Sequence, residues 1–177
     1  MIEPELVVPD AAEAVAAWFD RHAPAIAAYA TRRVGLTAAR DVVADTFRVA
    51  LEQFDVFDSA RGNERAWLFG IATNVVRRHW RTEERRLRAQ VRSVRADVRP
   101  VDPLLRIDDS VDAHRAYERI VDVVAQLPPD DRDLLVLVAW ERMSSNEAAA
   151  VLGIPPGTVR SRLHRLRTEL AEGTTNG

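Results

Sequence analysis

Apolar residues recur at steps of three and four along most of this 177-residue chain. The first such series, whose spacing places its members on one face of a helix, consists of Val15, Trp18, Phe19, His22, Ile26 and Tyr29. The alternating runs of β-branched residues that are typical of strands are missing. Ala, Leu, Arg and Glu dominate the composition, and all four favour helices. The sequence therefore predicts an all-α fold.

Glycine, proline and polar clusters divide this pattern into helices. In the first half, Gly35 and the polar stretch from Phe54 to Asn63 are the interruptions. We expect helices over about 11–34, with Gly35 as the stop, over 37–54, and from residue 63 or 64 past Trp80. Val42 and Phe47 belong to the buried stripe of the second of these helices.

The second half begins after Pro100 and Pro103, which end any continuation of the third helix. An apolar stripe in residues 116–127 predicts a helix that stops at Pro128. The next helix begins there, with Asp130 or Asp131 as its cap, and the Ser144 to Glu147 segment matches a capping box. Gly153 is expected to form a turn before a last helix from residue 156 or 158 to 170. We expect a tail (1–11), a domain (12–90), a flexible linker (91–113), a second domain (114–172) and a tail (173–177).

Charge is distributed unevenly along the chain. The net charge is −2, and every basic residue other than histidine is Arg. Residues 61–100 hold 11 Arg and 4 acidic residues, a net charge of +7, whereas residues 1–60 hold 5 Arg and 10 acidic residues, a net charge of −5. Seven Arg residues step by three and four, so a continuous helix would gather them on one face: Arg77, Arg81, Arg85, Arg88, Arg92, Arg95 and Arg99. Whether the helix continues to Arg99 stays open from the sequence.

The motifs of common enzyme classes are missing. The chain has no cysteine, and its four histidines are scattered without a metal-ligand spacing. It also lacks the glycine-rich phosphate-binding motifs and the nucleophile motif G-x-S-x-G. We therefore expect no enzyme activity, no metal and no cofactor. The sequence shows neither a signal peptide nor an apolar run of membrane-spanning length, which favours a cytoplasmic protein with no membrane insertion.

The capped helix, the turn at Gly153 and the last helix together describe a helix-turn-helix. In that motif the second helix enters the major groove of DNA. On the last helix Val159, Leu163 and Leu166 form the inward stripe, and a set of polar residues rich in Arg points outward. Arg can contact guanine with two hydrogen bonds, and Arg or Ser can hold phosphates. An ordinary solvated amphipathic helix would show a similar pattern, but the capped helix before it favours DNA binding.

Several segments resemble regions of one family. The segment 143–167 resembles region 4.2 of RNA polymerase sigma factors, and its part from Gly157 to Arg167 is especially similar to the small extracytoplasmic-function (ECF) type. The segment from Leu127 to Leu137 is similar to region 4.1. In the first half, Asp41 to Ala50 is similar to region 2.2, and residues 54–80 are similar to regions 2.3 and 2.4. The resemblance implies a sigma factor of the sigma-70 family that directs core polymerase to promoters and helps to open the −10 element.

The resemblance also implies roles for particular residues. Region 2.2 would dock on the clamp helices of the polymerase β′ subunit, region 4 on the β flap, and both DNA-binding regions on the promoter. The family's short members are often held inactive by an anti-sigma protein. The residues implied for core polymerase are Asp41, Val42, Asp45 and Phe47; for the −10 element Asn63, Arg65, Asn74, Arg77, Arg78, Trp80 and Arg81, with Trp67 as a weaker candidate; and for the −35 element Thr158, Arg160, Ser161, Arg162, His164 and Arg165.

Other interpretations remain open at this point. A stand-alone helix-turn-helix regulator that binds DNA as a dimer would explain residues 128–170, but not the basic segment 61–100 or the acidic docking helix. A helical adaptor without DNA contact is a third possibility. The acidic linker stretch from Asp102 to Asp112 fits either a mimic of a polyanion or a plain spacer.

Overall fold

A computed structural model of the chain describes residues 10–60, 63–91 and 126–175. Every element in these ranges is helical, which confirms the predicted fold class. Three expected features lie outside the described residues: the linker, the helix expected over 116–127 apart from its last residues, and the Arg residues beyond Val91. The elements are α1 (Ala11–Glu52), the 3-10 helix η1 (Phe54–Val56), α2 (Glu64–Val91), α4 (Pro129–Ala139), α5 (Ser145–Leu152) and α6 (Pro156–Thr175).

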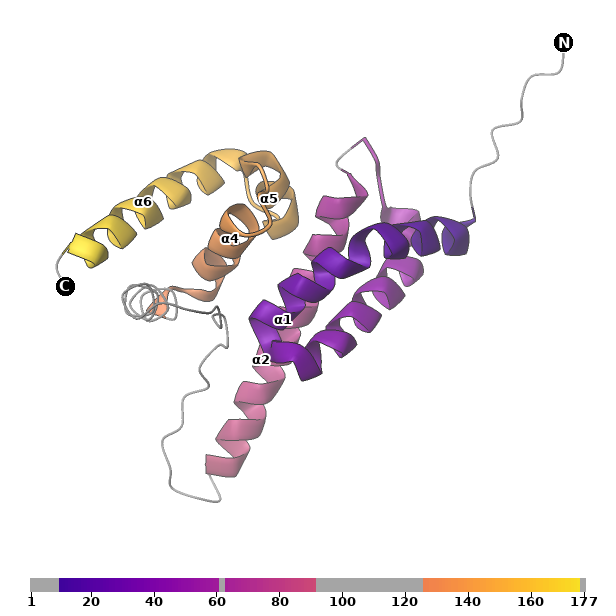
Figure 1. The fold of residues 1–177 in the computed structure, drawn as a ribbon, viewed down its shortest axis with the longest axis horizontal. Coiled ribbons are helices and arrows are strands. Elements are labelled where there is room, and N and C mark those ends of the chain that lie inside the picture. The colour runs from indigo at the N-terminus through magenta and orange to yellow at the C-terminus, as the bar shows by residue number, and fades with distance from the viewer. Residues whose placement is uncertain (1–9, 61–62, 92–125, 176–177) are drawn as a thin grey trace, which may run out of the picture.

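Gly35 divides α1 into two arms. Its backbone has φ 80° and ψ 165°, which lies outside the helical region inside an otherwise helical segment. That conformation is essentially restricted to glycine. Figure 1 shows α1 folding back at this break, so that the two arms lie beside α2. The two expected helices are therefore confirmed, and they join directly at the glycine.

The two arms of α1 and the first half of α2 share one core. Ile26 and Tyr29 of the first arm are fully buried, and so are Leu68 and Phe69 of α2. The Tyr29 hydroxyl and the Thr73 hydroxyl are hydrogen-bonded at 3.0 Å inside this core. Burial, with a smaller contribution from the Asp133 carboxylate, raises the pKa of Tyr29 to about 12.

The helices α4, α5 and α6 form a second core around Leu134, Leu137 and Leu166. The predicted capping box is confirmed, because the Ser144 hydroxyl accepts from the Glu147 amide and the Glu147 carboxylate accepts from the Ser144 amide. The Glu147 carboxylate accepts hydrogen bonds from the Ser144 amide and from the Ser144 hydroxyl, and these two bonds, the first above all, lower the pKa of Glu147.

Two further predictions concern the turn at Gly153 and the cap at the start of α4. Gly153 has φ 65°, so the predicted turn is a left-handed cap of α5. The prediction that Asp130 or Asp131 caps α4 is wrong: the cap position is Pro128, and no side chain bonds to the free amides there. Both carboxylates instead accept hydrogen bonds from arginine side chains, which supply charged donors.

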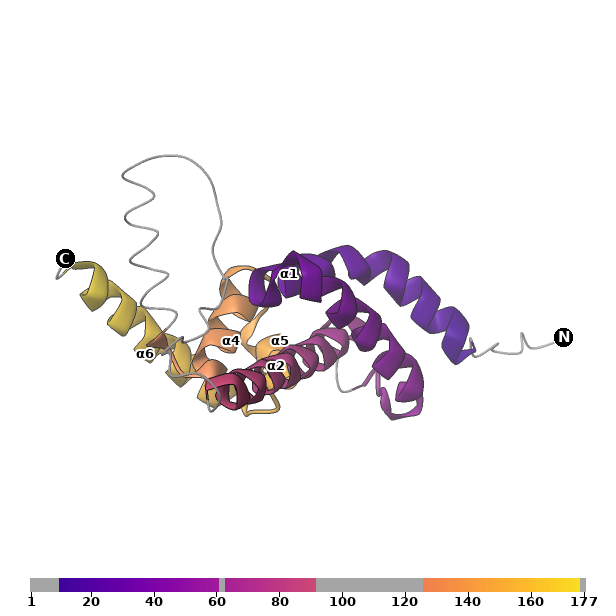
Figure 2. The same ribbon diagram turned by 90° about the horizontal axis from the view of Figure 1, so that it is seen from below.

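The two cores pack against each other through α2 and α5. Figures 1 and 2 both show α5 beside α2. Gly70 lies at the closest approach, where an added Cβ would meet the Val151 carbonyl oxygen at 3.7 Å and the Val151 Cα at 3.9 Å. The described parts of the two domains therefore form one closed arrangement.

Replacing Gly35 with alanine should destabilise the chain. A Cβ at this backbone conformation is strained, and we expect a loss of about 1–3 kcal/mol in the free energy of unfolding. Urea denaturation followed by circular dichroism measures this loss. Gly157→Ala is the matched control, because an added Cβ at Gly157 would meet only the Arg160 guanidinium at 4.0 Å. Equal stability of the two variants would contradict the role assigned to Gly35.

Candidate nucleic-acid interface

The recognition helix of the helix-turn-helix is α6. Val159, Leu163 and Leu166 are buried against α4 and α5, as the spacing predicts. The six residues predicted for the −35 element therefore lie together on the remaining surface of this helix. Of these, Arg160, Ser161, His164 and Arg165 are exposed, and Thr158 and Arg162 are half-buried.

A buried carboxylate from α4 holds part of this surface. Asp131 is 4% exposed, and its Oδ2 accepts from Arg165 Nη2 at 2.5 Å. Arg162 Nη1 lies 3.9 Å from the other oxygen of the same carboxylate. The outer side of Arg165 stays open to solvent, since half of its side chain is exposed. Asp131 thus contacts two residues predicted for the −35 element, a role that sequence reasoning missed.

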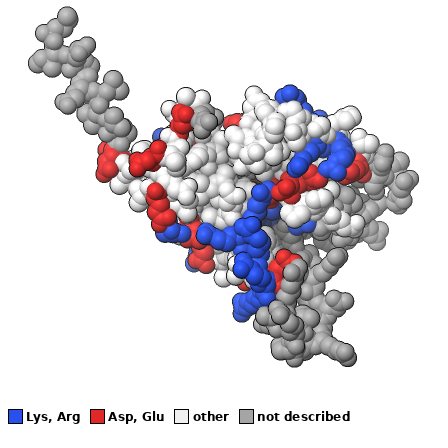
Figure 3. All heavy atoms as spheres, turned by 180° about the vertical axis from the view of Figure 1, so that it is seen from behind, with Lys and Arg blue, Asp and Glu red and all other residues white. Residues whose placement is uncertain are grey.

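The residues predicted for the −10 element lie along α2 from Arg65 to Arg81, with Asn63 directly before the helix. Asn74, Arg78 and Arg81 are exposed, whereas Arg65, Arg77 and Trp80 are half-buried. Figure 3 shows Arg side chains gathered on one face of the molecule, with carboxylates beside them. Asn63 precedes the helix and caps it, because its Oδ1 accepts from the Ala66 amide at 2.8 Å.

Three of these residues contact the second domain. Arg77 donates from Nε to Asp133 Oδ2 at 2.6 Å and from Nη2 to Asp130 Oδ1 at 2.7 Å. Burial of Arg77 opposes its charge, but the hydrogen bond to Asp133 and the negative charges of Asp133 and Asp130 together outweigh burial and raise the pKa of Arg77. Arg65 Nη2 donates to the Glu141 carbonyl oxygen at 2.9 Å, and Asn63 Nδ2 donates to Glu147 Oε1 at 3.4 Å.

The aromatic candidates differ in their surroundings. The Trp67 ring lies 5.8 Å from the Trp18 ring and 5.2 Å from the Phe57 ring. Trp67 is therefore part of an aromatic cluster that closes the end of the first core. The buried Trp80 Nε1 has no hydrogen-bond partner among the described residues.

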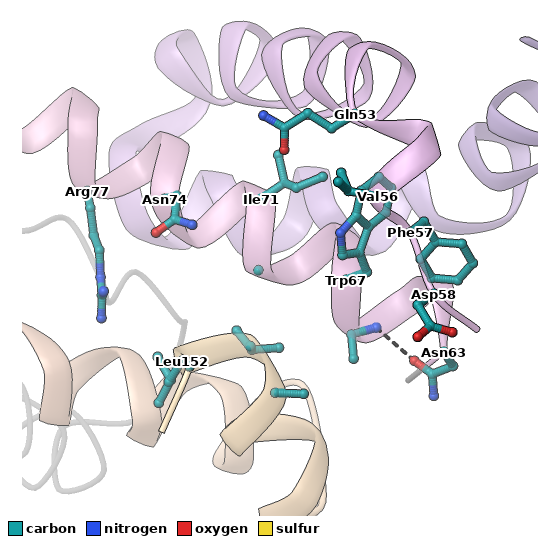
Figure 4. A pocket seen from close by; sticks show the side chains of 15 residues that line it. Gln53, Val56, Phe57, Asp58, Asn63, Trp67, Ile71, Asn74, Arg77 and Leu152 are labelled. Carbon is teal, nitrogen blue, oxygen red and sulfur yellow. Dashed lines mark hydrogen bonds between the residues drawn. The ribbon is translucent and has the colours of Figure 1, made fainter. Parts of the chain in front are cut away.

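A cavity of about 490 Å³ lies between α2 and α5. Figure 4 shows Trp67, Asn74 and Arg77 of α2 on one side and Leu152 on the other. Two predicted −10 residues, Asn74 and Arg77, therefore line the space between the domains. In the described ranges no group of acidic residues and histidines has the arrangement of a metal site.

The predicted polymerase-docking residues lie on the second arm of α1. Asp41 is exposed, and Asp45 Oδ1 accepts from Arg48 at 3.2 Å. Val42 and Phe47 are 3% and 7% exposed and belong to the core. In this structure they therefore lie under the predicted docking face and are not part of its exposed surface. The Phe47 ring packs against the ring of Phe19. Phe19 is 45% exposed, so its predicted place on the buried face of the first helix is wrong.

Two helical domains, one with a helix-turn-helix and one with an arginine-bearing helix, define a class of DNA-binding proteins. The family model "Sigma-70 region 2" matches residues 18–86, and the model "Sigma-70, region 4" matches residues 117–170. The chain belongs to the sigma-70 family, and its relatives place it in the ECF subfamily. No described helix is both long and apolar enough to span a membrane.

The chain is similar to curated relatives and to solved structures of this family. The ECF RNA polymerase sigma factor SigC of Mycobacterium tuberculosis is 38% identical over 75% of this chain and 68% of its own length. SigL of the same species is 34% identical over 84% and 81% of the two chains. The sigma factor RpoE of Bartonella quintana, solved in complex with the anti-sigma factor NepR, is 25% identical, with a TM-score of 0.61 over 90% of this chain and 96% of that one. CnrH, solved with the cytosolic domain of CnrY, is 30% identical, with a TM-score of 0.59 over 90% and 86%.

Asp131→Asn should make DNA binding less selective and more dependent on salt. The substitution removes one negative charge beside Arg165, so one more phosphate contact becomes available. The slope of log affinity against log salt should then steepen by up to about 0.9. Filter binding of specific and non-specific duplexes by the polymerase holoenzyme measures both effects. Glu169→Gln is the control, because Glu169 is exposed and lies 3.8 Å from Arg165; an equal effect there would argue against a special role of Asp131.

Proposed function

We propose that the chain directs RNA polymerase core to promoters as an ECF sigma factor and helps to open the −10 element. The observation that carries the proposal is the presence in one chain of two separate arginine-bearing helices, α2 and α6, in segments that match regions 2 and 4 of sigma-70 factors. A promoter presents two elements at a fixed distance. One chain with two DNA-binding helices suits that arrangement.

The helix α6 reads the −35 element in this proposal. Ser161, His164 and Arg165 contact base edges from the exposed side of α6. The Arg160 and Arg162 guanidinium groups and the Thr158 hydroxyl hold phosphates and fix the register of the helix in the groove.

The part of α2 up to Arg81 binds the −10 element in this proposal. Opening a duplex requires side chains that capture unstacked bases, and polar and aromatic groups beside Arg can do so. Asn63, Asn74 and Trp80 are the proposed base contacts. Arg65, Arg77, Arg78 and Arg81 hold the phosphates of the separated strand.

The second arm of α1 docks on the polymerase β′ clamp helices, and the second domain on the β flap. Asp41 and Asp45 supply negative charge, which suits a basic partner and speeds its encounter. The exposed Phe19 ring lies beside this arm and adds apolar surface. An anti-sigma protein is a further proposed partner, since RpoE and CnrH were each solved with a second protein bound. The chain itself supplies binding energy in the cytoplasm rather than catalysis.

Transcription in vitro with core polymerase tests the function. On a library of promoters, the chain should give sequence-selective transcripts, and it should bind promoter DNA tightly with core and weakly without core. Equal affinity in both conditions would instead favour a stand-alone regulator that binds DNA as a dimer.

Arg165→Ala should weaken promoter binding by the holoenzyme. A bidentate contact to guanine contributes about 1–3 kcal/mol, so we expect a loss of roughly 5- to 150-fold and relaxed specificity at one −35 position. Competition binding against promoters substituted at each −35 base measures both effects. Arg167→Ala removes the same charge from the same helix and should cost less. A uniform loss for all −35 sequences would show that Arg165 holds a phosphate instead.

Asp41→Arg should weaken assembly with core polymerase. The reversal places a positive charge in a face that is proposed to meet basic residues, so the affinity for core should fall at least about tenfold. Fluorescence anisotropy of the labelled chain with core measures this affinity. Glu13→Arg makes the same charge reversal at the exposed start of α1 and should leave assembly near the wild-type value. Unchanged assembly of the Asp41 variant would contradict the docking proposal.

A further inference from the structure

The first arm of α1 contacts the start of α2 through three side chains of one helical turn. Trp18, Arg21 and His22 are separated by three and four residues, so they share one face of that arm. The Trp18 ring lies 4.9 Å from the Phe57 ring, before α2, and 5.8 Å from the Trp67 ring, in the first turn of α2. This face of α1 therefore packs against the chain on both sides of the point where α2 begins.

The Glu64 carboxylate, in the first turn of α2, contacts the other two side chains of this face. Arg21 Nη1 donates to Glu64 Oε1 at 2.5 Å, and His22 Nε2 lies 3.4 Å from the same oxygen. An ionised carboxylate only accepts hydrogen bonds, so Nε2 must carry the hydrogen of this long hydrogen bond. The Arg21 side chain is 59% exposed, and such exposed ion pairs contribute little. The His22 side chain is 11% exposed, so burial leaves its imidazole few other partners.

Glu64 meets these partners as a charged carboxylate. A hydrogen bond from its own backbone amide, above all, and the His22 and Arg21 side chains together outweigh partial burial and lower the pKa of Glu64. A negative charge in the first turn also complements the dipole of α2. The His22 contact thus fixes a carboxylate that the start of the helix itself favours.

Glu64 lies between two residues that the proposed function assigns to the −10 element. Asn63 Oδ1 accepts from the Ala66 amide at 2.8 Å, so the cap of α2 fixes this side chain (Figure 4). The central carbon of the Arg65 guanidinium lies 5.0 Å from the centre of the Phe69 ring, one turn further along the same helix. The start of α2 therefore orients both side chains, and a shift of this turn would move both.

From these contacts we infer that His22 is a positioning residue for the opening of the −10 element. It binds Glu64 and thereby fixes the first turn of α2, from which Asn63 and Arg65 meet the DNA. His22 is buried, so it acts through Glu64 and not on the DNA itself. The inference rests on the proposed function, because it takes Asn63 and Arg65 as −10 contacts. Placement matters because a displacement of about 1 Å can cost roughly a hundredfold in rate.

Replacing His22 with leucine tests the inference in the polymerase holoenzyme. Leucine fills the buried space but cannot donate to Glu64. A hydrogen bond to a charged group changes an equilibrium by about tenfold or more, so the rate of −10 opening should fall at least about tenfold. Time-resolved permanganate footprinting of thymines in the −10 segment of a duplex promoter measures this rate. Affinity for core polymerase, measured by fluorescence anisotropy, should stay at the wild-type value.

Three comparisons separate positioning from a general loss of structure. On a promoter whose −10 segment is already unpaired, the His22→Leu holoenzyme should transcribe nearly as well as wild type, because no opening is needed. His22→Gln keeps a side-chain donor and should recover most of the opening rate. Tyr29→Phe is the matched control, since it removes the hydrogen bond to Thr73 between the same two helices. It should lower the stability of the chain without slowing opening.

Any of four results would overturn the inference: wild-type opening by His22→Leu, an equal loss on both promoters, no recovery by His22→Gln, or equal slowing by Tyr29→Phe. Glu64→Gln tests the same contact should His22→Leu fail to fold, because the Glu64 side chain is 26% exposed. It should slow opening by a similar factor, and normal opening would contradict the role of His22.

The double variant of His22→Leu and Glu64→Gln should open no more slowly than either single variant, because both changes remove one contact. Additive slowing would show that His22 acts by another route and would also overturn the inference. If the wild-type holoenzyme transcribes neither promoter, the proposed function itself is wrong, so the two failures are distinguishable.

Discussion

The buried carboxylate of Asp133 is the interaction on which the arrangement of the described helices depends. It accepts from Arg33 of α1 on one oxygen and from Arg77 of α2 on the other. Three helices from two domains thus meet at one fully buried negative charge. Such a charge is tolerated only when it is paired and hydrogen-bonded. The partners of Asp133 therefore determine where α4 can lie relative to the first domain.

Asp131, two residues earlier on α4, plays the corresponding part within the second domain. It holds Arg165 and Arg162 of the recognition helix, while Asp133 holds the arginines of the first domain. The start of α4 therefore connects the two proposed DNA-binding surfaces through carboxylate and guanidinium groups. Phosphate competes for guanidinium groups through the same geometry, so the contacts that order these arginines in the free chain are also those that DNA must replace.

Local signals in the sequence predicted the helices well, because each depends on a few neighbouring residues. Gly35, Gly153 and the Ser144 capping box all occur where expected. The contacts of Arg33 and Arg77 could not be predicted in this way, since their partners lie 100 and 56 residues away along the chain. Helical periodicity shows which face of a helix is covered, but not which segment covers it.

The same limit explains the differences within the candidate site. Val42 and Phe47 fit both a buried stripe and a docking edge by their spacing, and only the packing of α1 shows that they are buried. Asp130 and Asp131 stand in the first turn of α4, where acidic residues often cap a helix or complement its dipole. Arginine side chains from other helices bind them instead, because charged donors compete well with backbone amides. The acidic residues of the second domain thus serve to neutralise its own arginines and those of the first domain. This explains how a chain with a net charge of −2 can carry two arginine-rich surfaces without exposing all of their charge.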